Sequence, residues 1–163
     1  RNVHAYVLGE HGDSELVAWS AATLANVQLQ EYCRLTDMTC TGEDMTAIAA
    51  RVRDAAYEII RRKGATNFAI AAALTRIIEA VVRDEASVLT VSTLVEGHYG
   101  IHDVCLSLPA IVDRSGIRRV LPIPLSDDEV ERLRNSAAAV STAMTAAGFG
   151  EEQPALLKPA PDA

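Results

Sequence analysis

The chain has 163 residues, of which 49% are hydrophobic and 23% are charged, a composition typical of a single globular domain. No apolar run reaches the roughly eighteen residues that a membrane-spanning helix needs. The formal net charge of -7 argues against nucleic acid or an anionic membrane surface as a partner, because both attract basic proteins. We therefore expect neither kind of partner.

The cysteines and the first residues indicate the setting of the chain. Cys33, Cys40 and Cys105 are odd in number and form no CxxC pair, which favours reduced thiols in a cytoplasmic protein over a disulfide framework or a zinc knuckle. The chain begins at Arg1, without the basic and apolar segments of a signal peptide. We interpret it as a piece of a longer polypeptide.

The first part of the chain predicts two strands around a tight turn. Residues 3–8 and 16–20 are β-like, and glycines interrupt the segment between them. Residues 28–34 predict one or two helical turns, and residues 36–42 predict a loop.

Two long helices are expected next. Apolar residues recur at helical spacing from Met45 to Ile60, and Gly64 predicts the end of that helix. A second helix is expected from Thr66, with alanines that allow another helix to approach closely. Its apolar stripe consists of Ile70, Leu74, Ile77, Ile78 and Val81.

The last part predicts a meander and a final helix. Residues 88–94, 104–112 and 117–123 are rich in valine, isoleucine and leucine, and short turns without helices between them favour antiparallel pairing. Ser126 and Glu129 form a capping box, and Gly148 predicts the end of the last helix. We expect one domain over residues 1–150 and a disordered tail over residues 151–163.

One turn carries the strongest indication of chemistry. A histidine with an ordinary pKa near roughly 6.5 exchanges protons readily at neutral pH. A lone histidine in a turn more often only hydrogen-bonds to nearby backbone. Here it stands in the string Gly9-Glu10-His11-Gly12-Asp13-Ser14.

This string resembles the active-site signature of the L-lactate dehydrogenase family. The resemblance implies that His11 is the general acid/base that exchanges a proton with a 2-oxo acid while a hydride moves between substrate and NAD. It further implies pyruvate and L-lactate as substrates, and a homotetramer. The implied fold is the α+β, C-terminal substrate-binding half of the enzyme, with long helices packed on a mixed or antiparallel sheet.

A second stretch, residues 63–70, also resembles this family. The resemblance implies that the Thr66 hydroxyl faces the substrate and that Ile70 packs beside the nicotinamide ring. From the residues alone, threonine is a common N-cap and isoleucine a common core residue. Both interpretations stay open at this stage.

His4 lies in a segment that resembles the allosteric bacterial members of the family. The resemblance implies that His4 helps to hold fructose 1,6-bisphosphate at a subunit interface, with a partner arginine upstream of this chain. A surface histidine on a strand is an equally good interpretation.

Other candidate groups favour structural roles. Asp13 is expected to brace the turn through backbone hydrogen bonds. The spacing of His98, His102 and Cys105 suggests a zinc site, but nearby glycines argue against the helix that would bring the histidines together. We expect no metal.

The sequence lacks parts that the family needs for turnover. No G-x-G-x-x-G turn follows a strand, so the dinucleotide-binding domain is absent from this chain, and the substrate-clamping arginine of the family precedes Arg1. We therefore predict that the chain alone is inactive. The alternatives are a lactate-like malate dehydrogenase and a noncatalytic fragment that oligomerises or binds a regulatory phosphate.

Overall fold

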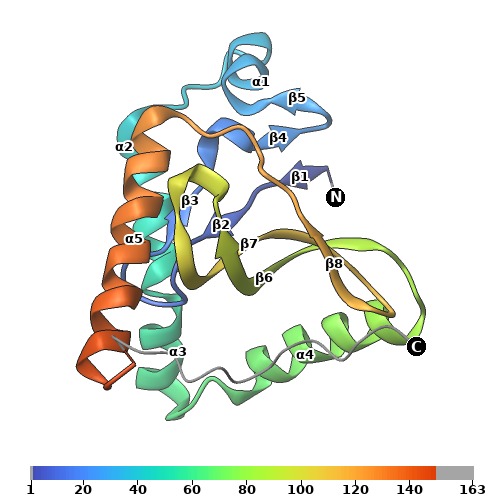
Figure 1. Ribbon diagram of the computed structural model, residues 1–163. Coiled ribbons are helices and arrows are strands. Elements are labelled where there is room, and N and C mark those ends of the chain that lie inside the picture. Colours follow the sequence, from blue (N-terminus) through green and yellow to red (C-terminus); the bar gives the residue numbers. More distant parts are fainter. Residues whose placement is uncertain (1, 150–163) are drawn as a thin grey trace.

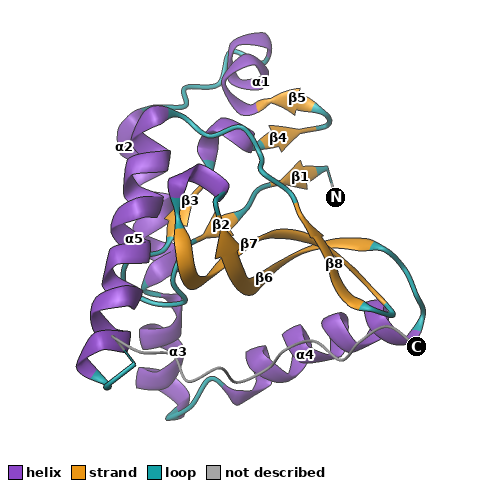
Figure 2. Cartoon of the chain, in the orientation of Figure 1, coloured by secondary structure: helices purple, strands orange, loops and turns teal. Residues whose placement is uncertain are grey.

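The computed structural model describes residues 2–149 of the chain (Figure 1). A three-stranded antiparallel sheet in the order β6-β7-β8 lies at its centre. The helices α2, α3 and α5 stand along one side of this sheet, and α4 extends below it (Figures 1 and 2). The α+β fold expected from the sequence is confirmed. None of the described helices is long and apolar enough to cross a membrane.

The central sheet is the meander that the sequence predicts. Its strands are β6 (Ser87–Glu96), β7 (His102–Asp113) and β8 (Gly116–Val120). β8 ends three residues before the predicted limit, and Pro122, which has no backbone N–H to donate, follows shortly after.

Short strands replace the two longer ones predicted near the N-terminus. β2 (Val7–Leu8) pairs with β3 (Leu16–Val17), and the chain then turns into the short helix η1 (Trp19–Ala21) instead of continuing as a strand. A separate small sheet joins β1 (Val3–His4), β4 (Thr23–Leu24) and β5 (Val27–Gln28).

The predicted helices form, with one break. They are α1 (Leu29–Leu35), α2 (Gly42–Arg53), α3 (Ala55–Lys63), α4 (Asn67–Val82) and α5 (Asp127–Ala146). The helix expected to run on to Ile60 divides at Asp54, whose φ of -80° and ψ of -5° end the regular α-helical path. The Asp54 carboxylate accepts a hydrogen bond from Arg53 Nε at 3.3 Å and does not cap α3, so the low helix propensity of aspartate is the sequence feature that fits this break.

The core lies between the meander, the strands around the first turn and α5. Its fully buried side chains include Leu8, Leu106, Leu108 and Leu133, each with an exposed fraction of 0%. Ser126 and Glu129 cap α5 reciprocally, as the sequence predicts. The core thus places the first turn directly against α5.

The apolar stripe of α4 is not part of this core. Ile70, Leu74 and Ile78 are between 50% and 58% exposed, whereas Ala80, near the C-terminal end of the helix, is fully buried. Among residues 2–149, the cover over α4 is therefore confined to its C-terminal part, and the helix contacts β7 of the central sheet.

The cysteine prediction is wrong. Cys33 and Cys40 form a disulfide across the end of α1, with 6.1 Å between their Cα atoms, and Cys105 is an exposed free cysteine. An odd count excludes complete pairing but does not exclude one bridge between two cysteines that the fold brings together. The tail predicted to be disordered, residues 151–163, lies outside the described residues.

Candidate active site

The turn that carries His11 is built on the core. β2 leads into Gly9, which is buried and exchanges two backbone hydrogen bonds with Ser107 of β7, at 3.0 and 2.8 Å. Gly9 adopts a φ of +98°, a conformation that side chains of L-residues rarely tolerate. The glycine is thus required by backbone geometry, and the sheet fixes where the turn begins.

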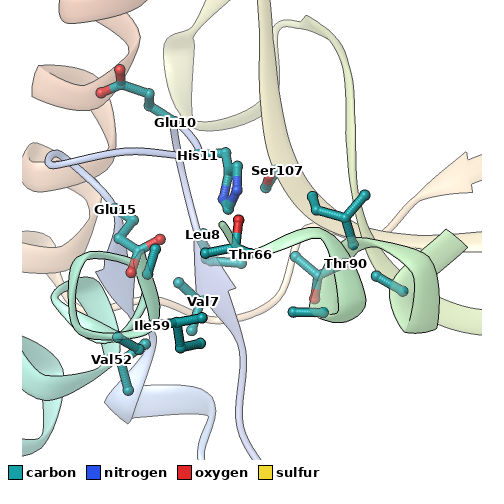
Figure 3. Close-up of a pocket in the computed structure, with 15 residues that line it drawn as sticks. Val7, Leu8, Glu10, His11, Glu15, Val52, Ile59, Thr66, Thr90 and Ser107 are labelled. Carbon is teal, nitrogen blue, oxygen red and sulfur yellow. The ribbon is translucent and has the colours of Figure 1, made fainter. Parts of the chain in front are cut away.

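Hydrogen bonds from α5 hold the next residues of the turn. The backbone N–H of Glu10 donates to Ser136 Oγ at 2.8 Å, and Ser14 Oγ lies 2.9 Å from the same atom. The Ser14 hydroxyl also donates to the Glu10 carboxylate. Figure 3 shows the Glu10 side chain pointing away from the His11 ring.

His11 is exposed at the tip of this turn and faces a cleft of about 480 Å³. In Figure 3 its ring and the Thr66 hydroxyl point toward one another. The cleft is lined by residues of the turn, of α2, α3 and α4, and of the central sheet: Val7, Leu8, Glu10, His11, Glu15, Val52, Ala55, Ala56, Ile59, Thr66, Ala69, Ile70, Ala73, Thr90 and Ser107. A small molecule in this cleft meets a proton-exchanging ring and a hydroxyl on largely apolar walls.

The structure brings together three of the four site residues predicted from the sequence. Thr66 stands at the N-cap of α4, yet its side chain makes no cap hydrogen bond, so its hydroxyl remains available to the cleft. Ile70 lines the cleft one turn further along and is 50% exposed, which excludes the interpretation as a core residue. His4 is exposed on β1 and does not line this cleft.

Two carboxylates near His11 have different surroundings. Burial raises the pKa of Glu15, and the positive charge of a protonated His11 partly opposes this rise. Asp13 accepts a hydrogen bond from the Tyr57 hydroxyl of α3 at 2.9 Å, so the prediction that it braces the turn through backbone bonds is wrong. The same bond to Asp13 raises the pKa of Tyr57.

Sequence reasoning missed Ser136, Tyr57 and Glu15. Ser136 is 125 residues from His11, and Tyr57 sits in a helix whose pattern gives no sign of its contact with the turn. Among residues 2–149, no group of three or more His, Cys, Asp or Glu side chains is placed to hold a metal ion.

Comparisons with known proteins agree with this geometry. Residues 1–149 match the family model described as lactate/malate dehydrogenase, alpha/beta C-terminal domain. The chain is 52% identical over 137 residues to an L-lactate dehydrogenase of Clostridium perfringens, a match that covers 84% of this chain and 43% of the relative.

Solved structures show the same similarity. A minor L-lactate dehydrogenase from Enterococcus mundtii superposes with a TM-score of 0.84 at 38% identity, covering 90% of this chain and 46% of the other. A malate dehydrogenase from Aeropyrum pernix superposes with a TM-score of 0.79 at 26% identity, covering 89% of this chain and 46% of the other. The chain thus spans a little under half the length of these relatives. With its fold, its cleft and its sequence in agreement, the chain belongs to the lactate/malate dehydrogenase family and corresponds to the family's C-terminal domain.

Proposed function

We propose that this chain is the substrate-binding half of an NAD-dependent L-lactate dehydrogenase that interconverts pyruvate and L-lactate. The observation that carries the proposal is that His11 and Thr66 face one another across a cleft of about 480 Å³ with largely apolar walls. Among the solved structures, identity of 38% to an L-lactate dehydrogenase, against 26% to a malate dehydrogenase, favours pyruvate over oxaloacetate.

His11 acts as the general acid/base. NADH, when bound, supplies the hydride that reduces the carbonyl carbon of pyruvate. A protonated His11 donates its proton to the carbonyl oxygen as negative charge develops there, and it removes that proton when lactate is oxidised.

The cleft fits the nicotinamide end of the cofactor. Ile70, Ala69 and Ala73 give α4 an apolar surface of small and branched side chains along the cleft, where a flat ring can pack. The sequence has no glycine-rich phosphate-binding turn, so the rest of a dinucleotide needs binding groups from outside this chain.

Orientation of the substrate also needs a group from elsewhere. Among the described residues that line the cleft, none is arginine or lysine, whereas a substrate carboxylate is best held by a bidentate arginine. Ala55 and Ala56 leave space for a small substrate, and the Thr66 hydroxyl supplies one hydrogen bond. We therefore expect the chain alone to be inactive.

The proposal includes assembly and regulation. The exposed apolar side chains of α4 support the expected homotetramer, because large apolar patches on a surface mark interaction sites. His4, exposed beside an equally exposed Val3, is available to a phosphate of fructose 1,6-bisphosphate. The location proposed is the cytoplasm, although the Cys33–Cys40 disulfide removes reduced thiols as support for it.

The test joins this chain to the N-terminal half of the Clostridium perfringens relative, and measures NADH oxidation with pyruvate and with oxaloacetate. We expect turnover with pyruvate, and a fall in kcat of about 10²- to 10⁴-fold on His11→Asn. His102→Asn is the matched control, because His102 is exposed on β7 and lies outside the cleft. The malate dehydrogenase alternative is tested in the complete enzyme with its own N-terminal half, where a preference for oxaloacetate would support it.

Two further outcomes separate the remaining proposals. A folded chimera without turnover, whose C-terminal half still binds a phosphate ligand, would favour the noncatalytic alternative. An unchanged response of His4→Gln to fructose 1,6-bisphosphate would remove the effector site from the proposal.

A further inference from the structure

Ser136 is a polar residue in the core next to the active-site turn. It lies on α5 with an exposed fraction of 0%, between the buried Leu133 and Ala137. A Cβ atom built on Gly9 would lie only 2.7 Å from Ser136 Oγ, so the turn passes directly over this hydroxyl. Such a close approach leaves no room for water between the turn and α5.

The hydrogen bonds around Ser136 form a closed ring, and their directions follow from chemistry. An ionised carboxylate only accepts, so Ser14 donates its single proton to Glu10. Ser136 therefore donates its proton to Ser14 Oγ across 2.9 Å. Its remaining lone pairs accept the backbone N–H of Glu10 at 2.8 Å, which closes the ring.

Two members of this ring, Glu10 and Ser14, flank His11 in the sequence. Glu10 precedes the histidine and Ser14 follows it three residues later, and both are fixed to one buried oxygen atom of a distant helix. Within the described chain, the His11 side chain itself makes no hydrogen bond. The backbone of the turn therefore sets where the Cβ atom of His11 stands, and with it the region that the ring can reach.

We propose that Ser136 is a positioning residue for His11. Its hydroxyl holds the turn that carries His11 against α5, without touching substrate itself. The proposal rests on the proposed function of His11 as acid/base. A displacement of about 1 Å can lower catalytic rates by as much as about a hundredfold, so loss of this anchor is expected to reduce kcat by about tenfold or more.

The first test needs no activity and uses the chain itself. Histidine-labelled NMR spectra are compared for the unchanged chain, Ser136→Ala and Ser141→Ala, with His4, His98 and His102 as internal references. We expect Ser136→Ala to shift the His11 signals alone and to speed amide exchange of Glu10 at least about tenfold. Ser141→Ala, an exposed change on the same helix, should do neither.

We expect Ser136→Ala to fold, because alanine has a higher helix propensity than serine. Ser14→Ala provides a second break of the ring at a half-buried position outside α5, and it should move the His11 signals in the same way. If Ser136→Ala does not fold, Ser14→Ala carries the test.

The second test measures kinetics in the chimera described above. Both variants should lower kcat while the KM for NADH stays within about twofold, because neither Ser136 nor Ser14 lines the cleft. A lower thermal midpoint with unchanged kcat and unchanged His11 signals would overturn the proposal, since that result describes a purely structural serine. An inactive parent chimera would refute the proposed function, and the NMR and exchange results would still decide the role of the ring.

Discussion

Glu129 offers a test of how α5 is fixed to the first turn. Its carboxylate is 4% exposed and accepts two backbone hydrogen bonds, from Ser20 to Oε1 and from Ser126 to Oε2, each at 3.0 Å. One bond caps α5, and the other joins the helix to the segment after β3. Replacement by glutamine keeps the shape but leaves one carbonyl oxygen for two donors.

The expected cost follows from that loss. Glu129→Gln removes one charge-assisted hydrogen bond and places the glutamine NH₂ group, which is a donor, opposite a backbone N–H, which is also a donor. The variant should therefore have a free energy of unfolding about 2 kcal/mol lower. Burial favours the neutral acid, but the N–H donors of Ser20 and Ser126 outweigh it and lower the pKa of Glu129 from its ordinary 4.5. The stabilisation is therefore fully present above pH 4.5 and is lost as the pH falls through the lowered pKa.

Urea unfolding measures this effect, with fluorescence of Trp19, the single tryptophan of the chain and the neighbour of Ser20. A loss of about 2 kcal/mol moves the midpoint at pH 7 down by about 1 M, if the m-value is about 2 kcal/mol/M. The difference from the unchanged chain should shrink toward pH 3. Glu131→Gln on the exposed side of α5 is the control. A difference that does not shrink at any pH below 4.5 at which both chains stay folded would refute the role of the ionised carboxylate.

Two other predictions concern the turn and the cysteines. Gly9→Ala should destabilise the chain by at least about 2 kcal/mol more than Gly116→Ala. Both glycines have a positive φ, but of the two only Gly9 would place a Cβ atom close to another atom, Ser136 Oγ at 2.7 Å. Equal thermal unfolding of the two variants would contradict the packing of the turn against α5. Alkylation of the denatured, unreduced chain should label Cys105 alone, because Cys33 and Cys40 are bonded to each other; mass spectrometry that finds three labelled thiols would contradict the disulfide.

Local patterns predicted the parts of the fold that depend on neighbours in sequence. The capping box at Ser126 and Glu129 satisfies backbone donors within one turn of helix, so four residues were enough to recognise it. The hexapeptide around His11 was likewise contiguous. The antiparallel meander followed because short turns leave no length for a crossover.

Contacts between distant segments could not be predicted in this way. Ser136 stands in a helical stretch of small residues, and only the passage of Gly9 over it makes the hydroxyl buried and bonded. The disulfide depends on the 6.1 Å separation that the fold gives Cys33 and Cys40, which a count of cysteines does not contain. The apolar stripe of α4 was recognised correctly, but periodicity does not reveal what covers it.

The two walls of the cleft are held in different ways, and the difference suits their proposed roles. The His11 wall rests on the fully buried Leu8 and on the backbone bonds that join the buried Gly9 to Ser107 of the central sheet. The opposite wall, made by α3 and the start of α4, consists largely of exposed residues such as Ile59 and Ile70. Few buried contacts mean low local stability, so backbone amides of this wall should exchange faster than those of the His11 wall in the chain alone. Proton transfer needs the more exact placement, and the acid/base stands on the wall that the core keeps in place.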